Sequence, residues 1–118
     1  MSKHLLIGLS IIMLFFKSSL LANYENKFYD FKINSITGET IDFKNYNGKV
    51  ILLVNTASYC GFTKQYNDLQ ILWDRYKTKG LVVIAIPSNS FNQEKDNDDE
   101  VKNFCEVNFN INFPISTI

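Results

Sequence analysis

Residues 54–66 read VNTASYCGFTKQY, and this stretch decides the fold. An apolar run, VILLV at residues 50–54, leads into it, and apolar residues at spacings of three and four follow it as far as Tyr76. The first pattern is typical of a strand buried on both faces of a parallel sheet, and the second of an amphipathic helix. Cys60 is therefore expected in the loop where a buried strand ends and a helix begins, with Thr63 as a cap of that helix.

The position of Cys60 predicts a reactive thiol. Unpaired amide N–H groups and the positive end of the helix dipole favour an anion at a helix N-terminus, so we expect the thiolate form of Cys60 to be stabilised there. Ser58 and Gly61 have small side chains, which let a small substrate approach the backbone. A buried structural cysteine is the alternative interpretation, and the pattern of strand, loop, cysteine, glycine and helix favours the reactive thiol.

The surrounding elements predict a layered α/β domain. Residues 28–43 alternate apolar and polar side chains around a turn at Thr37-Gly38, which is typical of a hairpin. Gly80 is placed to end the first helix, LVVIAI at residues 81–86 predicts a second buried strand, and a further helix is expected from Asp98. Strands and helices in this order predict a parallel pair at the centre of the domain.

Composition and charge limit the possible functions. The chain has 118 residues and a hydrophobic content of 46%, which suits one globular domain. Its formal net charge is zero, so no electrostatic argument favours nucleic acid as a partner. The sequence reaches Ile118 partway into another extended pattern, and we expect the domain to continue beyond that residue.

Residues 1–22 have the layout of a secretory signal peptide. A short basic start precedes an apolar run, Leu5–Phe16, and Ala22 suits the last position before cleavage. A membrane-spanning helix needs roughly twenty apolar residues, more than this run supplies. We predict a signal peptide over residues 1–22 and one domain over residues 23–118, exported to a periplasm. An uncleaved N-terminal anchor is the alternative.

The only histidine, His4, lies in the predicted signal peptide. The mature chain therefore has no imidazole to activate a cysteine in a Cys–His dyad, and none to hold zinc, copper or haem. We expect neither a metal nor a bound cofactor. Residues 95–100 are rich in acidic side chains, but they lack the central glycine and distal glutamate of a calcium loop. This run is interpreted as the solvated start of a helix.

Residues 54–91 carry a more specific pattern. They read VNTASYCGFTKQYNDLQILWDRYKTKGLVVIAIPSNSF, which closely resembles the glutathione peroxidase pattern V-N-x-A-S-x-C-G-x-T, a helix, and then G-L-x-I-x-x-F-P-C-N-Q-F-G-x-Q-E. The resemblance extends over residues 28–115. It implies a thioredoxin-like α/β fold, so residues 23–118 are expected to form the N-terminal part of a glutathione peroxidase domain, truncated at its C-terminus. Cys60 stands where animal relatives often carry selenocysteine, which implies the cysteine-dependent branch.

The resemblance also implies site residues. The family's catalytic tetrad is cysteine or selenocysteine, glutamine, tryptophan and asparagine. Cys60 matches the first and Gln93 the second, although the loop before Gln93 is one residue shorter than the pattern. The Gln93 amide is expected to donate a hydrogen bond to the thiolate or to the departing oxygen. The tryptophan–asparagine pair is expected downstream of Ile118, because Trp73 lies on the apolar helix face and is interpreted as core.

Cys105 has three possible roles. The segment around it resembles the F-C-x-x-N-[YF]-x-V-x-F-P-[MI] stretch of thioredoxin-dependent members, in which this cysteine resolves the sulfenic acid, and we favour that role. Cys105 also shares an apolar helix face with Val101 and Phe104, so a core position is an alternative. A permanent Cys60–Cys105 disulfide in an exported chain is the other. Ser88 replaces the cysteine of the family's F-P-C-N-Q-F motif and cannot act as a thiol.

The resemblance implies a thiol peroxidase that reduces hydrogen peroxide and organic or lipid hydroperoxides in the response to oxidative stress. Cys60 would form a sulfenic acid and then a disulfide with Cys105, with local rearrangement because both cysteines are expected near the starts of their elements. A thioredoxin-like protein is the expected reductant and glutathione the alternative; neither nucleic acid nor a lasting membrane span is expected.

Two other functions compete with the peroxidase. A thiol–disulfide oxidoreductase on the same fold requires Cys-x-x-Cys at the helix start, and the chain offers only Cys60 there. A secreted thioredoxin-fold domain with a structural disulfide and no peroxidase activity is the other alternative.

Overall fold

The structure is a computed structural model, and it describes residues 28–118. The predicted signal peptide, residues 1–22, lies outside the described residues, so its prediction stays untested. Among residues 28–118, neither helix has the length and apolar character that crossing a bilayer requires.

The order of elements follows the predicted alternation of strands and helices. A short hairpin comes first, two longer strands and two longer helices follow, and 3₁₀ helices lie between them. In chain order, the elements are β1 (Lys32–Asn34), β2 (Thr40–Asp42), a 3₁₀ helix (Phe43–Tyr46), β3 (Val50–Thr56), a 3₁₀ helix (Thr63–Gln65), α3 (Tyr66–Tyr76), a 3₁₀ helix (Lys77–Lys79), β4 (Leu81–Pro87) and α4 (Asp98–Phe109).

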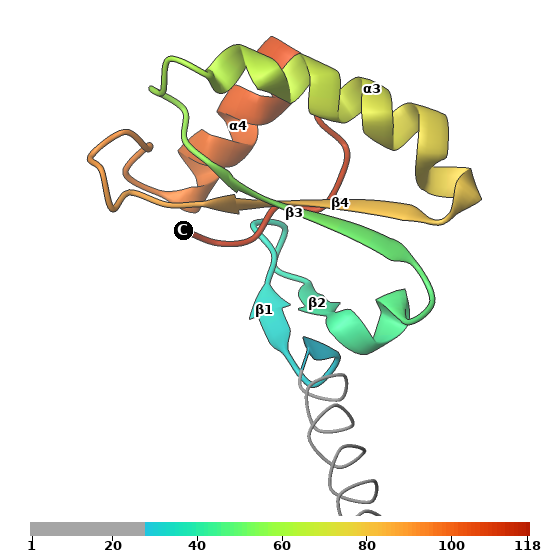
Figure 1. The fold of residues 1–118 in the computed structure, drawn as a ribbon. Helices are drawn as coiled ribbons and strands as arrows, with labels where there is room; N and C mark the ends of the chain where they lie inside the picture. The colour runs from blue at the N-terminus through green and yellow to red at the C-terminus, as the bar shows by residue number, and fades with distance from the viewer. Residues whose placement is uncertain (1–27) are drawn as a thin grey trace, which may run out of the picture.

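The centre of the domain is the predicted parallel pair. β3 and β4 run side by side in a register that pairs Val50 with Leu81 and Thr56 with Pro87. The β1–β2 hairpin is antiparallel, with Ile33 opposite Ile41. Figure 1 shows α3 and α4 on one face of the β3–β4 pair and the hairpin on the other. The layered α/β prediction is confirmed.

β4 is buried on both faces, as its uninterrupted apolar sequence predicts. Val83 and Ala85 point to the helices, where they join a core that includes Val101 and Cys105 of α4. Val82 and Ile84 point the other way and pack against a smaller core around the hairpin residues Ile41 and Phe43. Alternate side chains of one strand therefore hold the two layers together.

The same prediction is wrong for β3. Val50 is 70% exposed and Leu53 is 44% exposed. Within the described residues, β3 pairs with β4 along one edge only, and the neighbouring layers do not cover all of its side chains. An apolar run indicates that a strand has apolar neighbours, but it does not say which part of the fold supplies them.

The first helix ends as predicted and begins differently. Gly80 adopts a left-handed conformation with φ of 96°, which closes the 3₁₀ turn after α3. The expected cap at Thr63 is wrong, because its hydroxyl donates backward to the carbonyl oxygens of Ala57 (2.9 Å) and Cys60 (2.6 Å). Thr63 thus fixes the loop before the helix and leaves the first amides of α3 to other partners.

The acidic run before α4 forms a capped helix start. Asn97 accepts a hydrogen bond from the Glu100 N–H (3.0 Å), and its amide donates to the Glu100 carboxylate (2.8 Å). Asn97 is therefore the N-cap residue of α4, and a side-chain hydrogen bond to Glu100 supports this start. The interpretation of residues 95–100 as the start of a helix is confirmed.

The segment after α4 returns to the sheet. Asn110, with φ of 52°, ends the helix, and the Ile111 N–H then donates to the Cys105 carbonyl oxygen (3.2 Å). Ile115 makes a parallel bridge to Ala85 of β4, and Ser116 makes an antiparallel bridge to Ser35 of the hairpin. The predicted extended segment is therefore a link between β4 and the hairpin.

Candidate active site

Cys60 lies in the loop that follows β3. Its side chain is partly buried and its thiol is free. The residue lines a small cavity of about 70 Å³ together with Phe62, Gln65 and residues of α3 such as Tyr66 and Leu69. The loop after a central strand therefore presents the thiol to a space that is large enough for a small molecule.

The expectation that Cys60 stands at the N-terminus of the helix needs a correction. α3 begins at Tyr66, and the short 3₁₀ helix Thr63–Gln65 separates it from Cys60. The effect of a helix dipole falls off within the first turn. The macrodipole of α3 therefore acts on Cys60 only across an intervening 3₁₀ turn. The hydrogen bonds of the Thr63 hydroxyl hold the loop in that conformation.

Backbone contacts join the Cys60 loop to the Gln93 loop. The Tyr59 N–H donates to the Gln93 carbonyl oxygen at 2.8 Å. The neighbouring Ser58 N–H donates to Oε1 of Glu94 at 3.0 Å, and both Ser58 and Glu94 are buried. Two successive residues before Cys60 are thus bound to two successive residues of the other loop.

The side chain of Gln93 is exposed, and it does not line the Cys60 cavity. The structure therefore brings the backbone of Gln93 to the Cys60 loop and leaves its amide at the surface. The predicted hydrogen bond to the thiolate stays a prediction. Gln65, which the sequence interpretation did not select, is the glutamine that borders the cavity.

Lys95 adds a surface contact to the same junction. Its ammonium group donates a hydrogen bond to the Tyr59 hydroxyl and lies 4.2 Å from the centre of the Tyr59 ring. The same group lies 5.4 Å from the centre of the Phe104 ring on α4. The hydrogen bond to Tyr59 raises the pKa of Lys95. One partly exposed cation therefore contacts the residues that immediately precede the two cysteines.

Cys105 lies inside α4 rather than near its start, so that part of the prediction is wrong. The residue is fully buried in the core between the helices and β4, and its thiol is free. Residues 98–109 form one continuous helix because the cap at Asn97 starts it well before Cys105. The two cysteines are not joined by a disulfide in this structure.

Burial raises the pKa of the Cys105 thiol to about 11. The nearby Tyr66 hydroxyl opposes this rise, and the carboxylates of Glu94 and Glu106 add to it. The Tyr66 hydroxyl also has a raised pKa, chiefly because it is buried. Cys105 is therefore held as a neutral thiol inside the closed helix, and a neutral thiol is a poor nucleophile.

A cluster of buried oxygen atoms lies beneath the Cys60 loop. The Tyr66 hydroxyl lies near Thr56, which lowers its pKa, and near Cys105, which raises it. Four buried oxygens of the described residues nevertheless have no hydrogen-bond partner of normal geometry: Thr56 Oγ1, Ser58 Oγ, Tyr66 Oη and Glu94 Oε2. The sequence interpretation assigned no role to Thr56 or Glu94, although Glu94 follows Gln93 in the family's Q-E pair.

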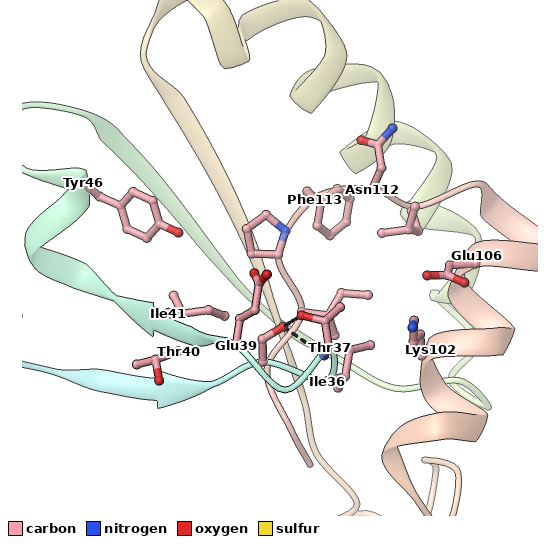
Figure 2. A pocket seen from close by; sticks show the side chains of 14 residues that line it. Ile36, Thr37, Glu39, Thr40, Ile41, Tyr46, Lys102, Glu106, Asn112 and Phe113 are labelled. Carbon is pink, nitrogen blue, oxygen red and sulfur yellow. Dashed lines mark hydrogen bonds between the residues drawn. The ribbon is translucent and has the colours of Figure 1, made fainter.

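Trp73 and a second, larger cavity lie outside the candidate site. Trp73 is partly buried and packs against the core of the helices, so its interpretation as core is confirmed. A cavity of about 370 Å³ lies between the hairpin, α4 and the segment 111–115. Figure 2 shows Thr37 and Glu39 of the hairpin turn on one side of it and Lys102 of α4 on the other. None of the predicted site residues lines this cavity.

The fold and the site define a class of protein: a thioredoxin-like α/β domain with a cysteine in the loop after a central strand. A secreted Mycobacterium tuberculosis disulfide oxidoreductase homologous to E. coli DsbE has the same fold, with a TM-score of 0.60 over 75% of this chain and 60% of its own, at 16% identity. The chain belongs to the glutathione peroxidase family, whose model matches residues 28–117.

Individual members of the family agree with this assignment. A hydroperoxy fatty acid reductase of Synechocystis is 42% identical over 80% of this chain, and a glutathione peroxidase-like peroxiredoxin of Schizosaccharomyces pombe is 44% identical over 75%. The crystal structure of T. cruzi GPX1 has a TM-score of 0.52 at 29% identity, covering 75% of this chain and 52% of its own. The chain spans about half the length of the curated relatives it matches, 56% for each of the two named here.

Proposed function

We propose that the protein is a thiol peroxidase that reduces hydrogen peroxide and organic or lipid hydroperoxides through Cys60. The observation that carries this proposal is a free, partly buried thiol at the edge of a small cavity, in a loop bound to the loop of Gln93. Relatives named as peroxidases or hydroperoxide reductases support the same chemistry.

In the first step, the Cys60 thiolate attacks the terminal oxygen of a hydroperoxide. The S–O bond forms as the O–O bond breaks, the sulfur is oxidised to a sulfenic acid, and the other oxygen leaves as water or an alcohol after taking up a proton. The Gln93 amide would donate a hydrogen bond to the thiolate or the departing oxygen, after a rotation of its exposed side chain toward the cavity.

In the second step, Cys105 condenses with the sulfenic acid, which forms a disulfide and releases water. Because Cys105 is buried inside α4, this step requires local opening of that helix. An external dithiol then reduces the disulfide through a mixed disulfide. We infer that the reductant is a thioredoxin-like protein rather than glutathione. We also infer that the peroxidase is exported and that it acts in the response to oxidative stress.

The test is a single-turnover reaction of the reduced protein with one equivalent of hydrogen peroxide, followed by mass spectrometry. We expect both thiols to be consumed as a Cys60–Cys105 disulfide accumulates. The Cys60→Ser variant is the control and should leave peroxide unconsumed. If the wild-type protein ignores peroxide while a Cys60–Cys105 disulfide persists in mild reductant, the domain is a disulfide-stabilised module without peroxidase activity.

A further inference from the structure

Glu94 occupies a position that the proposed chemistry does not use. The side chain is only 4% exposed, although glutamate is rarely buried without a specific partner. Its Oε1 atom accepts two backbone hydrogen bonds, from the Ser58 N–H at 3.0 Å and from the Lys95 N–H at 2.8 Å. Its own N–H donates to the Asn89 side chain at 3.1 Å. Two backbone N–H groups therefore hold the carboxyl group through one of its oxygens.

The two Oε1 contacts join segments that are far apart in the sequence. Ser58 lies two residues before Cys60, and Lys95 lies two residues after Gln93. The bond from Tyr59 to the Gln93 carbonyl oxygen runs beside them. Without the Glu94 acceptor, the Ser58 N–H would be a buried donor without a partner, which is costly. The conformation of the Cys60 loop thus depends on this carboxyl group.

The second oxygen extends the role of Glu94 into the core. Oε2 is buried and has no hydrogen-bond partner among the described residues. The same is true of the hydroxyl oxygens of Thr56, Ser58 and Tyr66. The charge of Glu94 also acts on both Tyr66 and Cys105, which places the carboxyl group near the buried thiol. One oxygen of Glu94 therefore contacts the Cys60 loop, and the other is a buried acceptor without a partner among the described residues.

We propose that Glu94 is a positioning residue for the peroxide reaction: its buried Oε1 holds the Ser58 N–H so that the Cys60 loop keeps a fixed register against the Gln93 loop. This inference rests on the proposed function. Reactions that depend on aligned groups lose about 100-fold when a group is misplaced by about 1 Å. The hydrogen-bond acceptor is the essential part of Glu94, so glutamine at this position should preserve the alignment and alanine should not.

The experiment compares Glu94→Gln and Glu94→Ala with the wild-type protein, and Glu106→Gln serves as a matched control because Glu106 is exposed on α4. Two quantities are measured: the rate constant of Cys60 oxidation by hydrogen peroxide, and the hydrogen exchange of the Ser58 and Tyr59 amides. We expect Glu94→Ala to slow oxidation by about 10- to 100-fold and to speed exchange of the Ser58 amide. The rate constants of Cys60 oxidation in Glu94→Gln and Glu106→Gln should stay within about threefold of the wild-type value, since each variant keeps a hydrogen-bond acceptor at position 94.

Three results would overturn the proposal. The first is a Glu94→Ala variant that reacts at the wild-type rate; the second is Glu94→Gln losing as much activity as Glu94→Ala; the third is unchanged exchange of the Ser58 amide in Glu94→Ala. If Glu94→Ala does not fold, Glu94→Asp replaces it, because its shorter side chain withdraws the acceptor and is expected to slow oxidation in the same way. A wild-type protein that ignores peroxide would refute the proposed function instead, and the exchange measurement would still decide whether Glu94 orders the loop.

Discussion

The Tyr59 N–H donates a hydrogen bond of 2.8 Å to the carbonyl oxygen of Gln93. The residue immediately before the candidate nucleophile is therefore bound to the backbone of the residue predicted to assist it. Because the contact is made by the backbone, it survives any rotation of the Gln93 side chain. The loop that is one residue shorter than the family pattern still brings Gln93 to the Cys60 loop.

The first prediction concerns the two glutamines near Cys60. Gln93→Ala should lower the rate constant of Cys60 oxidation by about 100-fold if its amide stabilises charge on the departing oxygen. Gln65→Ala is the matched control, because Gln65 borders the cavity but lies outside the family motif. Stopped-flow oxidation by hydrogen peroxide measures both. A loss in Gln65→Ala with no loss in Gln93→Ala would assign the role to Gln65.

The second prediction separates the two steps of the cycle. Cys105→Ser should leave the first oxidation of Cys60 at the wild-type rate, because Cys105 lies in the core and does not line the Cys60 cavity. Recycling by thioredoxin should stop, since no disulfide can form. Peroxide consumption is measured in a burst and then in the steady state with thioredoxin present. Normal steady-state turnover in this variant would exclude the resolving role of Cys105.

The third prediction follows from the raised pKa of Cys105, about 11 in the folded protein against an ordinary value of 9.0 for the thiol. Between these two values the folded protein keeps a proton that the unfolded chain releases. The contribution of this shift to the free energy of unfolding should therefore be fully present below pH 9. The free energy of unfolding should fall by about 2–3 kcal/mol as the pH rises toward 11. Urea unfolding across this range measures the effect.

Cys105→Ala is the control for that experiment. Tyr66, Glu94 and Glu106 act on the Cys105 pKa, and the burial of Tyr66 adds a decline of the same sign at higher pH. The variant keeps these groups and removes only the thiol, so its decline should be shallower than that of the wild-type protein. Equal slopes in the two proteins would show that Cys105 does not titrate in this way.

The fourth prediction concerns the turn between α3 and β4. Gly80→Ala places a Cβ at a residue with φ of 96°, a conformation that costs an L residue about 1–2 kcal/mol. The melting temperature should fall accordingly. Gly61→Ala is the control for stability, because a Cβ there meets nothing within 4 Å and the backbone is not left-handed. Similar melting temperatures for Gly80→Ala and wild type would contradict the prediction.

The sequence predicts the layered architecture well because its main determinants are local patterns. The apolar run of β4, the positive φ at Gly80 and the capped start of α4 follow from neighbouring residues alone. The exposure of β3 does not, because it depends on which elements cover the strand. The spacing of Cys105 from Val101 and Phe104 indicated a core position as one alternative, but it did not decide between that position and the resolving role. Propensity and periodicity leave both open.

The site shows the same division. Cys60 is identified by a specific motif in the correct loop, and the structure keeps it beside the loop of Gln93. The role of Thr63 was predicted wrongly, since a threonine at that position caps a helix or binds earlier carbonyl groups with equal chemical ease. Glu94 gave no signal of burial in the sequence, because an acidic residue in an acidic loop is ordinarily exposed.

The burial of Cys105 inside α4 sets a limit on the proposed cycle. Once Cys60 is oxidised, its sulfenic acid must wait until the helix opens, and during that interval a second hydroperoxide can convert it to a sulfinic acid that a thiol no longer rescues. The resistance of the protein to excess oxidant is then determined by how often one helix unfolds rather than by the reactivity of either sulfur. A substitution that destabilises α4 would lower the free energy of unfolding and, at the same time, slow the inactivation of the protein by excess peroxide.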